Sequence, residues 1–64
     1  MNQKQRILQF LKEATARGEF YNAVETSERL GFKKLHGSPY LQLEDEGKIE
    51  IIEEINKWRW VKDQ

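Results

Sequence analysis

The sequence predicts an α+β domain in which three helices precede a two- or three-stranded β-sheet. Apolar residues recur at helical spacing over 3–16, which is typical of a helix with one buried face. A second segment, 38–47, combines residues that favour a helix start with a glycine that can end it. Alternating apolar residues over 48–52 and 57–62 indicate two strands. A chain of 64 residues has room for one domain, which we expect to span 1–64.

The first predicted helix, at 3–16, has signals for its start and its end. Asn2 can cap the first turn, and Gly18 can end the helix shortly after its last apolar residue. The opposite face is polar, so one side of the helix is expected to enter the core. The expected buried residues are Ile7, Leu8, Phe10, Leu11 and Ala14.

The second predicted helix, at 23–30, follows a short aromatic segment. Asn22 is its expected N-cap, and Glu25 lies three residues on, as in a capping box. Gly31 is expected to end the helix, and Phe32 to return to the core. Its expected inner face consists of Ala23, Val24, Ser27 and Leu30.

The third predicted helix has the strongest start signal. Ser38 is the expected N-cap, because its hydroxyl can accept a hydrogen bond from the first turn. Pro39 suits the first helical position, because an N–H there has no partner within the helix and its absence costs no hydrogen bond. Tyr40 and Leu43 lie three residues apart and share a face, and Gly47 can adopt the left-handed conformation that ends helices.

Residues 33–37 separate the second helix from this start. They contain Lys33, Lys34 and His36, which form the one local basic run of the chain. Two local structures are open for this segment. It is either a long turn, or a helical turn that is broken before Pro39, because proline clashes with the preceding turn of a helix.

The predicted hairpin runs from the strand at 48–52 through a turn at 53–56 into the strand at 57–62. Asn56 is the turn residue that best tolerates a positive φ. In the second strand, Trp58 and Trp60 fall on one face. We expect these indole rings to close the core rather than to stack on bases, because a small domain needs their large apolar area.

This order of elements resembles the winged helix-turn-helix superfamily, and in particular its small bacterial and phage-type regulators. The resemblance extends over almost the whole chain, but its residues are generic. They are Ile7-Leu8-x-Phe10-Leu11, Ser27-Glu28-Arg29-Leu30-Gly31, Tyr40-x-x-Leu43-x-x-x-Gly47-Lys48-Ile49 and Trp58-x-Trp60. The resemblance also implies a one- or two-residue strand at 19–22 that pairs with the wing.

Two segments, 5–11 and 47–49, are also similar to winged helices that bind left-handed Z-DNA. That subfamily has an asparagine and a tyrosine on the third helix and a proline pair in the wing. This chain has Tyr40, but it lacks the asparagine and has no proline in the wing. The specificity for left-handed DNA is therefore not transferred.

The resemblance implies a small DNA-binding protein that regulates transcription. Lysine, arginine and histidine can neutralise phosphates, serine can donate to a phosphate or a base edge, and glutamine can pair with adenine. Double-stranded DNA is the expected partner, and a homodimer reading two half-sites would compensate for the few phosphate contacts. The candidate DNA-binding residues are Lys33, Lys34, His36, Ser38, Gln42, Asn56, Lys57 and Arg59.

Other interpretations of the same residues remain open. Lys33, Lys34 and His36 also fit a solvated turn, and exposed Lys57 and Arg59 can protect a strand edge from aggregation. The 11 acidic and 11 basic side chains cancel, and an acidic edge would repel phosphates if it faced DNA. This edge instead suits a basic protein partner. It consists of Glu44, Asp45, Glu46, Glu50, Glu53 and Glu54.

Several function classes find no support in the sequence. There is no cysteine, no metal-binding spacing and no pairing of a nucleophile with a base. We therefore expect no catalytic residues, no metal, no cofactor and no enzymatic activity. The sequence contains no apolar run long enough for a signal peptide or a membrane span. A complete, soluble cytoplasmic protein without membrane contact is the expectation.

Overall fold

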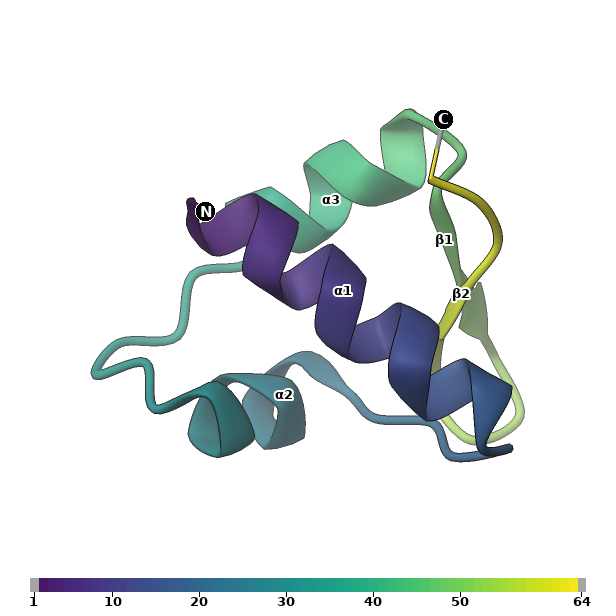
Figure 1. Ribbon diagram of the computed structural model, residues 1–64, viewed down its shortest axis with the longest axis horizontal. Coiled ribbons are helices and arrows are strands. Elements are labelled where there is room, and N and C mark those ends of the chain that lie inside the picture. The colour runs from purple at the N-terminus through teal and green to yellow at the C-terminus, as the bar shows by residue number, and fades with distance from the viewer. Residues whose placement is uncertain (1, 64) are drawn as a thin grey trace.

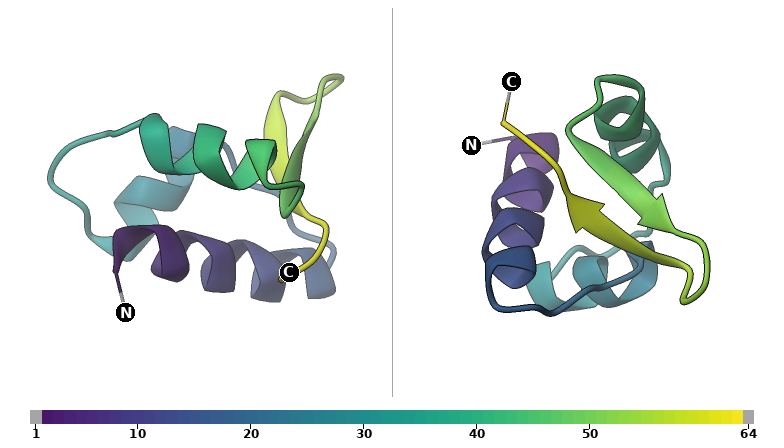
Figure 2. Two further views of the ribbon diagram at one scale, coloured as in Figure 1. Left: turned by 90° about the horizontal axis from the view of Figure 1, so that it is seen from above. Right: turned by 90° about the vertical axis from the view of Figure 1, so that its right-hand side faces the viewer.

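The computed structural model describes residues 2–63, and its elements follow the predicted order (Figure 1). Three helices precede a two-stranded antiparallel sheet, an α+β layout consistent with a winged helix. The hairpin stands at one end of the molecule and the loop between the second and third helices at the other (Figures 1 and 2). The elements are α1 (Gln3–Ala16), α2 (Ala23–Leu30), α3 (Ser38–Asp45), β1 (Ile49–Ile52) and β2 (Lys57–Trp60).

Both predicted caps of the first two helices are confirmed. The Asn2 side chain accepts a hydrogen bond from the Gln5 N–H at 2.8 Å, and the Gln5 side chain accepts one from the Asn2 N–H at 3.0 Å. Asn22 and Glu25 make the same reciprocal pair at 2.8 and 3.0 Å. Each pair satisfies N–H groups that have no partner within the helix.

The predicted cap of α3 is wrong. Gly37 is the N-cap, no side chain caps this start, and Ser38 is already helical. The carbonyl of Gly37 accepts the first two helical bonds, from the N–H groups of Tyr40 and Leu41, both at 3.1 Å. Pro39 therefore lies one position further into the helix than expected. It is tolerated there because an N–H in the first turn has no helical partner.

The predicted stop of α3 is confirmed. Gly47 adopts φ 74°, in the left-handed region that a side chain would strain. The N–H of Lys48 then donates to the carbonyl of Leu43 at 2.9 Å, which closes the last turn. The chain leaves this turn directly into β1, so the glycine sets the angle between α3 and the hairpin.

The core lies between α1, α3 and the hairpin. Its buried residues are Ile7, Leu11 and Ala14 of α1, Tyr40 and Leu43 of α3, and Ile49 and Trp58 of the strands. The Tyr40 ring stacks on Trp58 with 6.2 Å between centroids. Its hydroxyl has one proton, which it donates to the Ala23 carbonyl at 3.2 Å, so Ser27 is the donor in the 3.1 Å bond between the two hydroxyls.

The hairpin is shorter than predicted, and the short strand predicted at 19–22 is a single bridge at Tyr21. Ile51 pairs with Trp58 in the antiparallel register, and Tyr21 forms an isolated bridge to Trp58 on the other side. The strand predicted to reach residue 62 ends at Trp60. Beyond Trp60, the N–H groups of Val61 and Lys62 both donate to the carbonyl of Lys48 instead of continuing the ladder.

The inner face of α2 differs from the prediction at one position. Ser27 is buried and Ala23 and Leu30 pack against the core, but Val24 remains 50% exposed. Thr26 is fully buried in its place. The residues at 23, 26, 27 and 30 form one stripe at i, i+3, i+4 and i+7, and position 24 lies beside that stripe.

Replacing Tyr40 with Phe tests the bonds of its hydroxyl. The ring would still stack on Trp58, while the buried oxygens of Ser27 and Ala23 would lose a partner. We expect Tyr40→Phe to lower the free energy of unfolding by about 1–2 kcal/mol in urea denaturation. The neighbouring Leu41→Ala, at a side chain that is 61% exposed, should change it by less than about 0.5 kcal/mol. Equal effects of the two substitutions would contradict this assignment.

Candidate interaction surface

The predicted basic run lies in the long loop that joins α2 to α3. No helical turn forms there, so the long turn is the correct alternative for this segment. Lys33, Lys34 and His36 are all exposed. Within residues 2–63, none of the three forms an ion pair. The charges of Lys33 and Lys34 are therefore available to a partner.

Ser38 and Gln42 lie next to this loop, on the first turns of α3. Both side chains are exposed. The amide nitrogen of Gln42 donates to the Ser38 hydroxyl at 3.2 Å, so the two predicted contact residues bind each other across one helical turn. To contact a base edge, Gln42 and Ser38 would have to break this bond or form a second hydrogen bond beside it.

The two cations of the wing are paired with acidic side chains. The ammonium of Lys57 lies 3.1 Å from one carboxylate oxygen of Glu25 and 3.3 Å from the other. Arg59 pairs with Glu50, its cross-strand neighbour. Asn56 is exposed in the turn with φ 54°, as the sequence predicts. The wing therefore presents little free positive charge.

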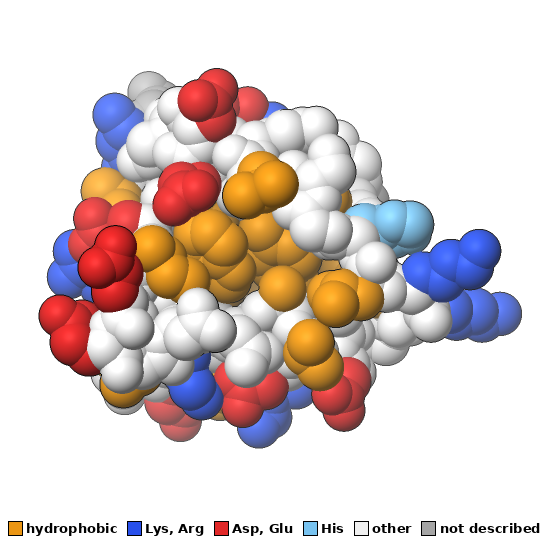
Figure 3. Space-filling view, turned by 180° about the vertical axis from the view of Figure 1, so that it is seen from behind, with side chains coloured by type: hydrophobic (Ala, Val, Ile, Leu, Met, Phe, Trp, Pro, Cys, Tyr) orange, Lys and Arg blue, Asp and Glu red, His pale blue; other side chains and the backbone are white. Residues whose placement is uncertain are grey.

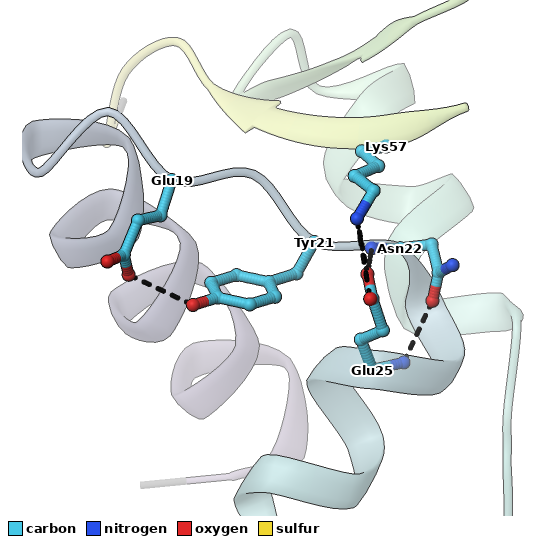
Figure 4. Close-up of polar contacts among 5 residues, drawn as sticks. All are labelled: Glu19, Tyr21, Asn22, Glu25 and Lys57. Atoms are coloured by element: carbon cyan, nitrogen blue, oxygen red, sulfur yellow. Dashed lines mark hydrogen bonds and ion pairs between the residues drawn. The ribbon is translucent and has the colours of Figure 1, made fainter. Parts of the chain in front are cut away.

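Glu25 joins the start of α2 to the second strand (Figure 4). Its carboxylate accepts a hydrogen bond from the Asn22 N–H and also contacts the ammonium of Lys57. The bond from Asn22, and next to it the bond from Lys57, hold the pKa of Glu25 below its ordinary value of 4.5. Above that value the ionised carboxylate contributes its full stabilisation, which is lost as the pH falls through the lowered pKa.

The structure does not bring the two predicted cationic groups together. The loop with Lys33 and Lys34 projects from one end of the molecule, and the hairpin with Lys57 and Arg59 forms the other end (Figures 1 and 2). A ligand that contacts both groups has to cross the face between them. The character of that face therefore decides what can bind.

The face between the loop and the wing is apolar at its centre (Figure 3). A shallow hollow of about 270 Å³ lies there, bordered by the start of α2, β1 and β2. Val24 is half exposed in its wall, and Trp58, which is 9% exposed, also lines it. We call this surface the apolar face. It is lined by Asn22, Ala23, Val24, Ile51, Asn56 and Trp58.

Sequence reasoning missed this surface because it assigned Val24 and Trp58 to the core. Trp58 is indeed 9% exposed and belongs to the core, but Val24 does not. A local signal existed for Val24. It lies in the first turn of an eight-residue helix whose other inner positions complete a stripe without it.

The acidic edge is only partly neutralised. Glu46 pairs with Lys4 and with Lys48, which hold its pKa below the ordinary value, and Glu50 pairs with Arg59. The remaining acidic side chains of this edge are exposed and form no ion pair within the described residues. They are Glu44, Asp45, Glu53 and Glu54.

The exposed charges and the apolar face are groups that can bind a partner. Within residues 2–63, no three His, Cys, Asp or Glu side chains gather in a way that could hold a metal ion. No helix in the same range has the length and apolar character needed to cross a membrane. Comparison of the chain with protein-family models, curated proteins and solved structures gave no match.

Replacing Lys57 with Gln separates the effects of the two bonds on the pKa of Glu25. We expect the pKa of Glu25 in Lys57→Gln, followed by ¹³C NMR of its carboxyl group, to rise but to stay below its ordinary value. The hydrogen bond from Asn22 is the larger cause of the shift and remains in place. Lys34→Gln, which removes a cation from the distant loop, should leave the titration unchanged. A full return to the ordinary value in Lys57→Gln would show that the cap contributes nothing.

Proposed function

We propose that this chain is a non-enzymatic winged-helix module that binds a protein partner across its apolar face. The proposal includes membership of the winged helix-turn-helix superfamily, which the order of the elements supports, and a cytoplasmic location. The observation that carries it is a half-exposed Val24 beside Ile51 and Trp58, in a hollow between α2 and the hairpin. Apolar side chains gathered in a hollow are typical of surfaces that bind other proteins.

The pairing of the wing cations supports this choice over duplex DNA as the main ligand. Lys57 and Arg59 are the wing residues expected to contact phosphates, and each is already bound to a carboxylate. Glu44 and Asp45 add free negative charge to the end of α3. A duplex lying over the end of α3 and the wing would meet acidic side chains and cations that are already paired, which offer little to a phosphate backbone.

DNA binding, as in a transcriptional or phage/plasmid regulator, is a second candidate, and one observation favours it. Lys33, Lys34 and His36 are exposed and free of ion pairs within the described residues, and they precede the exposed Ser38 and Gln42. DNA bound in this way would contact the loop and the start of α3, with little help from the wing. Such binding would be weak and would fall as salt rises.

Photo-crosslinking separates these two functions. A benzophenone amino acid is placed at Val24 on the apolar face, at Leu35 in the basic loop, or at Glu13 on the outer face of α1, and the full chain is irradiated in its own cells. All three side chains are exposed. We expect specific protein adducts from position 24, because that side chain would be buried in the interface, and few from position 13.

The nature of the adduct decides the outcome. Nuclease-sensitive adducts at position 35, with no protein adduct at 24 above the level at 13, would overturn the proposal and support DNA binding. Protein adducts at 24 that persist after nuclease treatment would support the protein-binding function. The adducts also identify the partner, because mass spectrometry of the crosslinked peptides names the second chain.

A further inference from the structure

Free charges of opposite sign lie at the two ends of the surface that carries the apolar face. Figure 3 shows hydrophobic side chains in the middle, acidic side chains toward the hairpin, and lysine and histidine side chains toward the loop. At the hairpin end, Glu53 and Glu54 occupy the turn of the wing; at the loop end lie Lys33 and Lys34. None of these four side chains forms an ion pair within residues 2–63.

We propose that the partner bound at the apolar face is a second copy of this chain, related to the first by a two-fold axis through that face. This inference rests on the proposed function and names its partner. In a two-fold dimer the same patch is used by both copies, so Val24 and Ile51 of each copy pack against the apolar face of the other. We place the axis in the plane of the interface and perpendicular to the line from the loop to the hairpin. The rotation then reverses the order of charges, and Lys33 and Lys34 of one copy lie against Glu53 and Glu54 of its partner.

Charge complementarity favours a second copy over other occupants. A basic helix would be attracted by Glu53 and Glu54 but repelled at the loop by Lys33 and Lys34. A nucleic acid would be repelled at the acidic end. The best occupant carries an apolar centre with both charges in reversed order. This chain has that surface itself, and its 11 basic and 11 acidic side chains leave no net charge to oppose self-association.

The surface area available for the interface limits the strength of the association. A stable interface buries roughly 800 Å² of each partner, which is about one fifth of the 4344 Å² surface of this chain. The apolar face is a shallow hollow, so the dimer is expected at the small end of the range, with a dissociation constant of about 10 to 100 μM. The charged ends then fix the orientation more than the affinity.

Sedimentation velocity with charge-reversed variants tests this inference. The full chain is measured from about 5 μM to about 1 mM, which spans the expected dissociation constant. We expect Lys33→Glu with Lys34→Glu, and separately Glu53→Lys with Glu54→Lys, to weaken self-association about tenfold or more, because each change places like charges together at both ends. An equimolar mixture of the two variants should form a heterodimer of roughly wild-type affinity, and the chain with all four reversals should again self-associate.

Two controls make the result specific. Val24→Glu should abolish the dimer, because it buries a carboxylate at the centre of the interface. Glu13→Lys, a charge reversal at an exposed position of α1, should leave the dimer unchanged. Each variant is compared with the wild type by thermal unfolding, and a conservative Val24→Ala keeps the test valid if the glutamate impairs folding. Val24→Ala should weaken the dimer by a few-fold.

The outcomes distinguish this inference from the function on which it rests. A wild-type chain that stays monomeric at 1 mM, or a mixture of reversed variants that fails to associate, would overturn the second copy as partner. Protein adducts at position 24 that join this chain to a different protein would then leave the proposed function intact. A dimer that is insensitive to both Val24 substitutions would instead place the interface elsewhere and count against the apolar face itself.

Discussion

The ring of Tyr40 stacks on Trp58 of β2, while its hydroxyl reaches α2 through Ser27 and the carbonyl of Ala23. A single side chain of α3, only 1% exposed, therefore contacts both α2 and the hairpin, which lie far apart in the sequence. Burial raises the pKa of this phenol above its ordinary value of 10.0, so its neutral, hydrogen-bonded form persists to higher pH than that of an exposed tyrosine. Buried aromatic rings also contribute large apolar areas, which a domain of this size needs.

This contact determines which surface stays exposed. It holds α2 and β2 at a spacing that buries Ser27 and most of Trp58, and Glu25 spans the remaining distance to Lys57 on one side. Val24 then lies outside the contact, in the wall of the apolar face. The same Glu25 neutralises a wing cation. The packing of the fold thus both exposes an apolar surface and withdraws a positive charge from it, and each effect favours a protein partner.

The sequence predicted the order of elements because its signals are local. The cap at Asn22 and the positive φ of Asn56 each depend on a few neighbouring residues, and both are confirmed. The prediction that Ser38 is the N-cap was wrong, because its hydroxyl contacts the next turn of α3 and the preceding glycine is the N-cap. The pairing of Lys57 with Glu25 joins positions 32 residues apart, so no local sequence pattern predicts it. The candidate site was therefore predicted as a set of exposed cations, without the ion pairs that change its character.

Native-state amide hydrogen exchange tests the central claim that the contacts of Tyr40 make α2, α3 and the hairpin one cooperative unit. The N–H groups of Thr26, Leu43 and Trp58 report on these three elements, and those of Thr26 and Trp58 donate to Asn22 and Tyr21 at 3.0 and 2.9 Å. We predict that all three amides exchange through one opening, with the free energy and denaturant dependence of global unfolding. Exchange of Trp58 through a separate opening of lower free energy, while the helices stay protected, would contradict the account.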